Sequence, residues 1–145
     1  DSAKGAYIIR DFQSSPPKMG TLIVQGTSAV ANILKILDEI EEREFNVKIV
    51  CATSAELFNL QPEIYRAKVF SDFDRSNSMV ITTQSKSQMH DWMFNPQTNA
   101  YTLSADWDNR WRTGGTLEEV INEAHLSPEW LLKGISRFVK EHINR

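Results

Sequence analysis

The sequence predicts an α/β protein, a three-layer α/β/α sandwich around a sheet of about five strands. Two observations carry this prediction. Short apolar runs alternate with segments of helical periodicity, which is the pattern of βαβ units on a largely parallel sheet. The length of 145 residues is near the commonest size of one domain. We therefore expect an N-terminal strand and linker at residues 1–20 and an α/β domain at residues 21–145.

The first half of the chain supplies three strand-like runs, expected at residues 6–10, 21–25 and 48–52. The stretch QSSPPKMG before the second run is rich in proline and serine and favours a loop. Apolar residues then recur at helical spacing over residues 30–40, which predicts one helix covering one face of the sheet. The residues of this stripe are Val30, Ile33, Leu34, Leu37 and Ile40.

The second half continues the alternation. Helices are expected at residues 54–59, 62–70 and 85–94, and strands at residues 78–83 and 100–105. A final helix is expected after Ser127, Pro128 and Glu129, which supply an N-cap, a first-turn proline and an acidic residue. The residues expected in the core are Leu34, Leu37, Ile49, Val80 and Ile81.

Composition and charge exclude several classes of protein. The formal charge of −3 and the pI near 5.6 argue against nucleic acid and anionic membranes as partners. No apolar run approaches the roughly 18 to 20 residues of a membrane span, and no secretory signal pattern opens the chain. The single cysteine cannot form an internal disulfide, so we expect a cytoplasmic protein.

The sequence assigns no catalytic residue and no metal site. It contains no dinucleotide-binding, P-loop or nucleophile-elbow motif. The three histidines, His90, His125 and His142, lie far apart along the chain and do not show the close spacing of zinc ligands.

Two places could still carry chemistry. Gly26, Thr27 and Ser28 lie between a strand and a helix, where backbone N–H groups can hold a phosphate or carboxylate; the alternative is a plain turn that Thr27 or Ser28 caps. Cys51 ends a strand, where helix dipoles can activate a thiol; the alternative is an ordinary buried core cysteine.

Three tryptophans fall in loop-rich sequence and are candidates for an interface. Trp92 lies beside a methionine and a phenylalanine, and Trp107 and Trp111 belong to the stretch DWDNRWR. Aromatic residues with arginine are typical of protein interfaces, although tryptophans also cover the open ends of cores.

One segment resembles a known family. The stretch SAELFNLQPEIYR at residues 54–66 is similar to the S-x-E-L-F-x-x-Q-x-x-x-Y-R segment of transketolase C-terminal domains. It follows a strand–Gly–helix unit, TLIVQGTSAVANILKIL, that is also similar to the last domain of 2-oxoacid dehydrogenase first components. The residues that match the signature are Ser54, Glu56, Leu57, Phe58, Gln61, Tyr65 and Arg66.

The resemblance implies a mixed sheet whose first strand runs antiparallel to the others. It also implies a non-catalytic domain for assembly and regulation, because in this family thiamine diphosphate, its magnesium and the activating glutamate belong to the two preceding domains. The parent would be a dimeric enzyme that transfers ketol units between sugar phosphates or decarboxylates a 2-oxo acid. No G-D-G cofactor motif occurs in this chain, so we expect it to bind no cofactor. Two alternatives stay open, a free-standing domain that binds an anion or small molecule and a small thiol enzyme built on Cys51.

Overall fold

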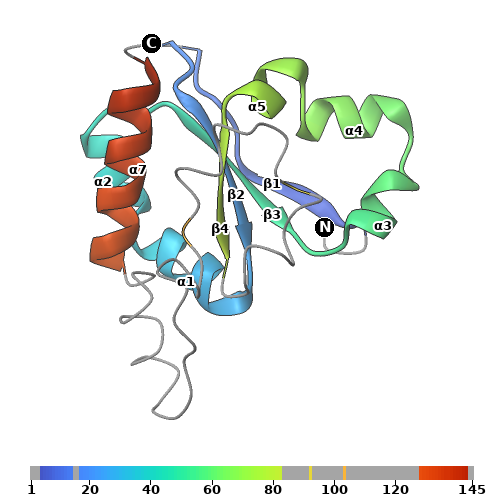
Figure 1. Ribbon diagram of the computed structural model, residues 1–145, viewed down its shortest axis with the longest axis horizontal. Coiled ribbons are helices and arrows are strands. Elements are labelled where there is room, and N and C mark those ends of the chain that lie inside the picture. Colours follow the sequence, from blue (N-terminus) through green and yellow to red (C-terminus); the bar gives the residue numbers. More distant parts are fainter. Residues whose placement is uncertain (1–3, 15–16, 83–91, 93–102, 104–127, 144–145) are drawn as a thin grey trace.

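Four strands and six helices are present in the part of the chain that the computed structural model describes, which comprises residues 4–14, 17–82, 92, 103 and 128–143 (Figure 1). In chain order the elements are β1 (Ala6–Arg10), β2 (Gly20–Gln25), α1 (Thr27–Lys35), α2 (Leu37–Glu42), β3 (Val47–Ala52), α3 (Ala55–Asn59), α4 (Glu63–Val69), α5 (Asp72–Ser76), β4 (Ser78–Thr82) and α7 (Pro128–Ile143). The four strand predictions that fall on these residues are confirmed to within one residue at each end. Within the described ranges, no helix has the length and apolar character needed to cross a membrane.

The strands form one mixed sheet in the order β1-β3-β2-β4. β2 lies between β3 and β4 and is parallel to both, whereas β1 pairs with β3 in the antiparallel direction. The antiparallel first strand that the family resemblance implies is thus confirmed. Leu103 forms a parallel bridge with Ile81 beyond β4, where the fifth strand is expected, but the rest of residues 100–105 lies outside the described residues.

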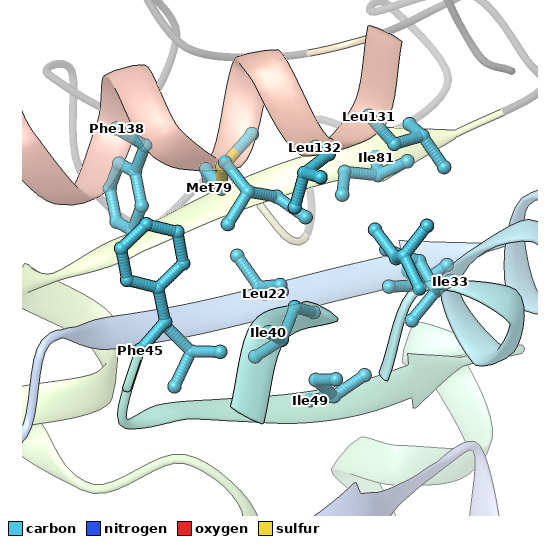
Figure 2. Packing of buried hydrophobic residues seen from close by; sticks show 14 of the residues in the cluster. Leu22, Ile33, Ile40, Phe45, Ile49, Met79, Ile81, Leu131, Leu132 and Phe138 are labelled. Atoms are coloured by element: carbon cyan, nitrogen blue, oxygen red, sulfur yellow. The ribbon is translucent and has the colours of Figure 1, made fainter. Parts of the chain in front are cut away.

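The first helical layer consists of α1, α2 and α7 and covers one face of the sheet. Leu22 and Ile49 point into this layer from β2 and β3, and Leu131 and Phe138 point toward the sheet from α7 (Figure 2). Side chains alternate between the two faces along each strand, so every second residue points toward this layer. Strands that are apolar throughout therefore contribute to a core on each face of the sheet.

The second layer, on the opposite face, is smaller and contains α3 and α4. Its core joins Ile23, Val50 and Val80 of the sheet to Phe58 and Val69 of the helices. The two faces together make the three-layer sandwich that the sequence predicts.

The prediction of one long helix at residues 30–40 is wrong in one respect. The backbone leaves helical geometry at Ile36 (φ −106°, ψ 8°), and this break divides the segment into α1 and α2. The buried side chains of this segment are those of Ala29, Ile33, Ile36 and Ile40. Leu34 is next to Ile33 and so points about 100° away from it around the helix. Its side chain is 48% exposed, which corrects its assignment to the core. Leu37 is only half-buried.

The remaining core predictions are confirmed, since Ile49, Val80 and Ile81 are fully buried. The predicted helix at residues 85–94 lies outside the described residues except for Trp92, and so does the N-cap at Ser127.

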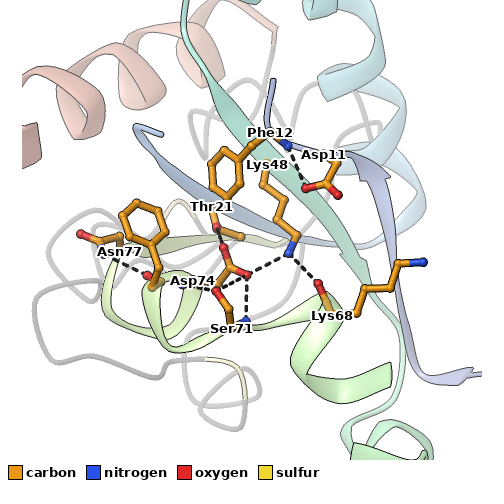
Figure 3. A network of polar contacts seen from close by, with 9 residues as sticks. Asp11, Phe12, Thr21, Lys48, Lys68, Ser71, Asp74 and Asn77 are labelled. Carbon is orange, nitrogen blue, oxygen red and sulfur yellow. Dashed lines mark hydrogen bonds and ion pairs between the residues drawn. The ribbon is translucent and has the colours of Figure 1, made fainter. Parts of the chain in front are cut away.

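A charged pair is buried at the amino ends of the strands. The Nζ of Lys48, on β3, lies 2.8 Å from Oδ2 of Asp74, on α5, and also donates to the carbonyl oxygen of Lys68 at 2.9 Å (Figure 3). The hydroxyl of Thr21 donates to the other oxygen of Asp74 at 2.8 Å. A capping box with Ser71 begins α5 and adds the Ser71 backbone N–H to the same carboxylate. Every oxygen of this buried carboxylate therefore has a donor.

Candidate functional site

The carboxyl ends of β2 and β3 form a topological switch point. The chain leaves β2 through α1 on one face of the sheet and leaves β3 through α3 on the other, and the two strands are neighbours (Figure 1). Open α/β sheets place their ligand sites at such points, because the diverging loops leave a crevice between the strand ends.

A cavity of about 390 Å³ lies at this point, within the usual size range of small-molecule sites. β2 and α1 contribute Gln25, Gly26 and Val30, whereas Cys51, Ala52 and Thr53 come from the end of β3, and Tyr7 comes from β1. The residues that line the cavity therefore come from segments that are far apart in the sequence, between Tyr7 and Thr53.

Gly26 lines the cavity at the point where α1 begins. It is the N-cap of α1, with φ 103°, a conformation that favours glycine, and no side chain makes a capping hydrogen bond. The first bond within the helix runs from Val30 N to Gly26 O, so the earlier N–H groups have no partner inside the helix. Thr27 and Ser28 are the first two helical residues, and neither is the N-cap; their side chains lie outside the described parts.

Cys51 and Tyr7 meet across the β1–β3 pair, where they are register partners. A hydrogen bond with the Cys51 side chain, the electrostatic effect of the same group and burial raise the pKa of Tyr7, so the phenol is neutral at physiological pH. Cys51 itself is 6% exposed, as the alternative of a buried core cysteine requires. A neutral phenol, a largely buried thiol and backbone N–H groups can bind a ligand, but they form no evident acid–base pair.

No metal centre emerges in the described ranges, where no three His, Cys, Asp or Glu side chains gather closely enough to hold an ion.

The signature segment uses its polar residues mostly to build this domain. Ser54 is the N-cap of α3, and its hydroxyl accepts from Leu57 N at 3.2 Å. The amide of Gln61 donates to the Leu57 carbonyl at 3.1 Å, and Nε of Arg66 donates to the Gln61 carbonyl at 3.1 Å. The Tyr65 hydroxyl donates to the carbonyl of Ala6 at 2.8 Å and so fastens β1 to α4.

The other signature residues divide into one buried and two exposed side chains. Phe58 is buried in the second core, whereas Glu56 and Leu57 are exposed on α3. Within the segment, Ser54 therefore caps α3, Phe58 packs in the second core and Tyr65 links α4 to β1. The exposed side chains of Glu56 and Leu57 are available for contacts outside the domain.

Of the three tryptophans predicted to form an interface, only Trp92 lies in the described part of the chain. Its side chain is 6% exposed and lies 5.9 Å from Phe58 and 6.0 Å from Phe70, between ring centroids. It belongs to the second core in this chain, and its part in an interface stays a prediction. Trp107 and Trp111 lie outside the described residues.

The sequence indicated the strand-to-helix turn and Cys51 but missed the other residues that line the cavity. Tyr7, Gln25 and Thr53 each stand at a strand end, which is the one signal that points to them. The hydroxyl of Thr82 donates to Oε1 of Gln25 at 2.8 Å and ties the ends of β2 and β4 together.

The mixed sheet, its helical layers and the signature segment define an α/β domain of the type that ends transketolases. The chain matches the family described as "Transketolase-like TK C-terminal domain" over residues 5–106, well over half its length. It therefore belongs to that family. No curated protein sequence matches the chain well enough to add to this assignment.

Solved transketolases share the fold at low sequence identity. The transketolase of Pichia stipitis in complex with sedoheptulose-7-phosphate is 13% identical with a TM-score of 0.66, over 99% of this chain and 19% of that one. Transketolase from Leishmania mexicana is 16% identical with a TM-score of 0.66, over 97% of this chain and 18% of that one. An inactive β4 tetramer of a split-gene transketolase is 11% identical with a TM-score of 0.55, over 95% of this chain and 43% of that one. The chain thus spans about a fifth of the single-chain transketolases that it matches.

Proposed function

We propose that this chain is the non-catalytic C-terminal assembly domain of a transketolase-type, thiamine diphosphate-dependent enzyme. The observation that carries the proposal is the family match over residues 5–106, in a chain that corresponds to about a fifth of the solved transketolases. The parent would transfer ketol units between sugar phosphates, as a homodimer in the cytoplasm. The family match favours this parent over a 2-oxoacid dehydrogenase.

Two further observations support an assembly role. The signature residues Ser54, Gln61, Tyr65 and Arg66 serve the domain's own rigidity, and the described residues contain no group of three His, Cys, Asp or Glu side chains that could hold a metal ion. The split-gene relative is a transketolase whose similar chain is found as an inactive tetramer. Both fit a domain that needs the rest of an enzyme in order to take part in catalysis.

The purified 145-residue chain should neither bind thiamine diphosphate with magnesium nor turn over sugar phosphates. Calorimetry with cofactor and magnesium checks this expectation. The matched control is the full-length product of the same gene, which should bind the cofactor if it carries the two other domains. Binding to the isolated chain tighter than roughly 10 μM, worth about 7 kcal/mol, would contradict the proposal because it needs a preorganised diphosphate site.

A second candidate function, binding of a small anion, is favoured by the cavity at the switch point. Its wall includes Gly26, the N-cap of a helix that no side chain caps. The backbone N–H groups of Thr27 and Ser28, in the first turn of α1, and the positive end of the α1 dipole are suited to a phosphate or carboxylate. Such a ligand would regulate the parent enzyme or, if the domain acts alone, be its main ligand.

A phosphate titration followed by amide NMR tests this candidate. We expect progressive shifts at Gly26, Thr27 and Ser28, with a dissociation constant of about 1 mM or weaker, because few groups would contact the anion. The start of α3 is the internal control, since the Ser54 side chain already caps it. Unchanged amides at the three residues, or larger shifts elsewhere, would rule out the anion site.

A further inference from the structure

Large apolar side chains are exposed along the α3–α4 segment. Leu57 is 42% exposed, Leu60 76% and Ile64 86%, and the remaining large exposed hydrophobic side chain in the described ranges is Leu34 on the opposite layer. Phe58 fills the core from the inner side of α3, while Leu57 and Leu60, three residues apart, lie on its outer side. Apolar side chains grouped in this way mark contact surfaces.

The same two helices hold the N-terminal end of the described chain. The carbonyl of Gly5 accepts from Thr53 N at 2.8 Å and from Ser54 N at 2.9 Å, just before α3. Tyr65, on α4, binds the Ala6 carbonyl, and Nζ of Lys4 lies 4.6 Å from the centre of the Tyr65 ring. Figure 1 accordingly shows the start of β1 beside α3. Any segment that precedes residue 4 enters the domain next to this surface.

We propose that Leu57, Leu60 and Ile64 form the surface on which the preceding domain of the parent transketolase-type protein docks. This inference rests on the proposed function. The family is a C-terminal domain, so the rest of such a protein precedes it, and the chain spans only 19% of the solved Pichia stipitis transketolase. A domain tethered at the N-terminal end has a high local concentration at α3 and α4, so a small apolar patch is enough to hold it.

A second copy of this chain fits the surface less well. A stable interface between free partners buries about 800 Å² on each side, far more than three partly exposed aliphatic side chains offer. The exposed charges along this segment have both signs, with Glu56 and Glu63 next to Leu57 and Ile64 in sequence and Lys68 one helical turn after Ile64. We therefore expect the complementary surface on the preceding domain to be chiefly apolar.

The test uses the full-length protein with the double substitution Leu60→Glu and Ile64→Glu, which places charges in the proposed contact. We expect protease cleavage at the junction before this domain to accelerate by at least about tenfold, because undocked domains expose their linker. Leu34→Glu is the matched control, an exposed leucine on the other layer, and should cleave at the wild-type rate. Leu60→Ala with Ile64→Ala, which adds no charge, should give a smaller increase in the same direction.

The outcomes separate the two proposals. If a full-length variant without this domain assembles and works like the wild type, the assembly function fails. If that deletion impairs assembly but both double variants cleave at the wild-type rate, the docking surface is wrong and the assembly function stands. Loss of a concentration-dependent self-association with an unchanged cleavage rate would assign the surface to a second copy and overturn the inference.

Discussion

Asp74→Ala is expected to lower the free energy of unfolding by about 3 to 5 kcal/mol. The reason is the ammonium group of Lys48, whose side chain is 4% exposed and would be left buried without its counter-ion. The hydroxyl of Thr21 would lose its acceptor at the same time, and α5 would lose half of its capping box with Ser71. Truncating one partner of a buried pair costs more than the pair itself contributes, because the remaining charge has no solvent around it.

Urea unfolding followed by circular dichroism measures this loss. Asp72→Ala is the matched control, since Asp72 is exposed in the same short helix and its removal should cost less than about 1 kcal/mol. Replacing both charges at once, Lys48→Met with Asp74→Leu, should recover much of the stability. A loss below about 1 kcal/mol for Asp74→Ala would mean that the pair is not buried in solution.

The same pair makes stability depend on pH in a defined direction. Burial alone would raise the pKa of Asp74, but the hydrogen bonds from Lys48, Ser71 and Thr21 and the charge of Lys48 outweigh burial and lower it. An aspartate with a depressed folded-state pKa contributes stability that is fully present above its unfolded pKa of about 3.9 and is lost as pH falls through the folded value. The stability difference between the wild type and Asp74→Asn should therefore shrink below about pH 4, and the same difference at pH 3 and pH 7 would contradict this assignment.

The sequence predicted the strands well but missed this charged pair, for a physical reason. Lys48 lies in an apolar strand, and its partner belongs to α5, a five-residue helix that a capping box starts and that has too few turns to show a periodicity. The capping signal, Ser71 followed three residues later by Asp74, is present in the sequence but is common in turns as well. Only the crossing of α5 over the amino ends of β2 and β3 identifies the pair.

The helical stripe was predicted with the right period, but its centre was misplaced. Ile33 and Ile40 are buried, and Val30 and Leu37 pack against the same core, whereas Leu34 is exposed and Ile36 is buried in addition. A stripe of apolar residues that is wider than the buried face does not show which of its edges faces the sheet, so Leu34 could not be distinguished from its neighbours by spacing alone.

The candidate site could be predicted only where residues that are close together in the sequence form it. Gly26 to Ser28 are recognisable because a strand-to-helix turn needs a glycine. Tyr7 reaches the cavity because β1 joins the sheet antiparallel to β3, an arrangement that the family resemblance implies but that the local sequence does not encode. Strand order is a property of long-range pairing, so residues brought in by β1 stay hidden from local patterns.

Phe138→Ala is the second large expected effect, a loss of about 3 to 5 kcal/mol in the free energy of unfolding. Phe138 is 1% exposed and packs from α7 into the first core together with Leu131 and Ile135. Its ring also lies over Gly20, where a β-carbon would come within 2.5 Å of the ring. The ring therefore fits against bare backbone at the start of β2, and truncation leaves a cavity that the rigid strand cannot close.

Chemical denaturation of the variant gives the magnitude, and Lys140→Ala, at an exposed position of the same helix, is the control that should change stability by less than about 0.5 kcal/mol. Phe138→Leu should cost less than Phe138→Ala, because leucine refills part of the space over Gly20. Gly20→Ala with Phe138→Ala should restore part of that volume, although the alanine must then adopt the φ of 145° that Gly20 has. If Phe138→Ala costs less than about 1 kcal/mol, α7 does not hold the first layer together, and the stability of the domain rests on α1, α2 and the sheet alone.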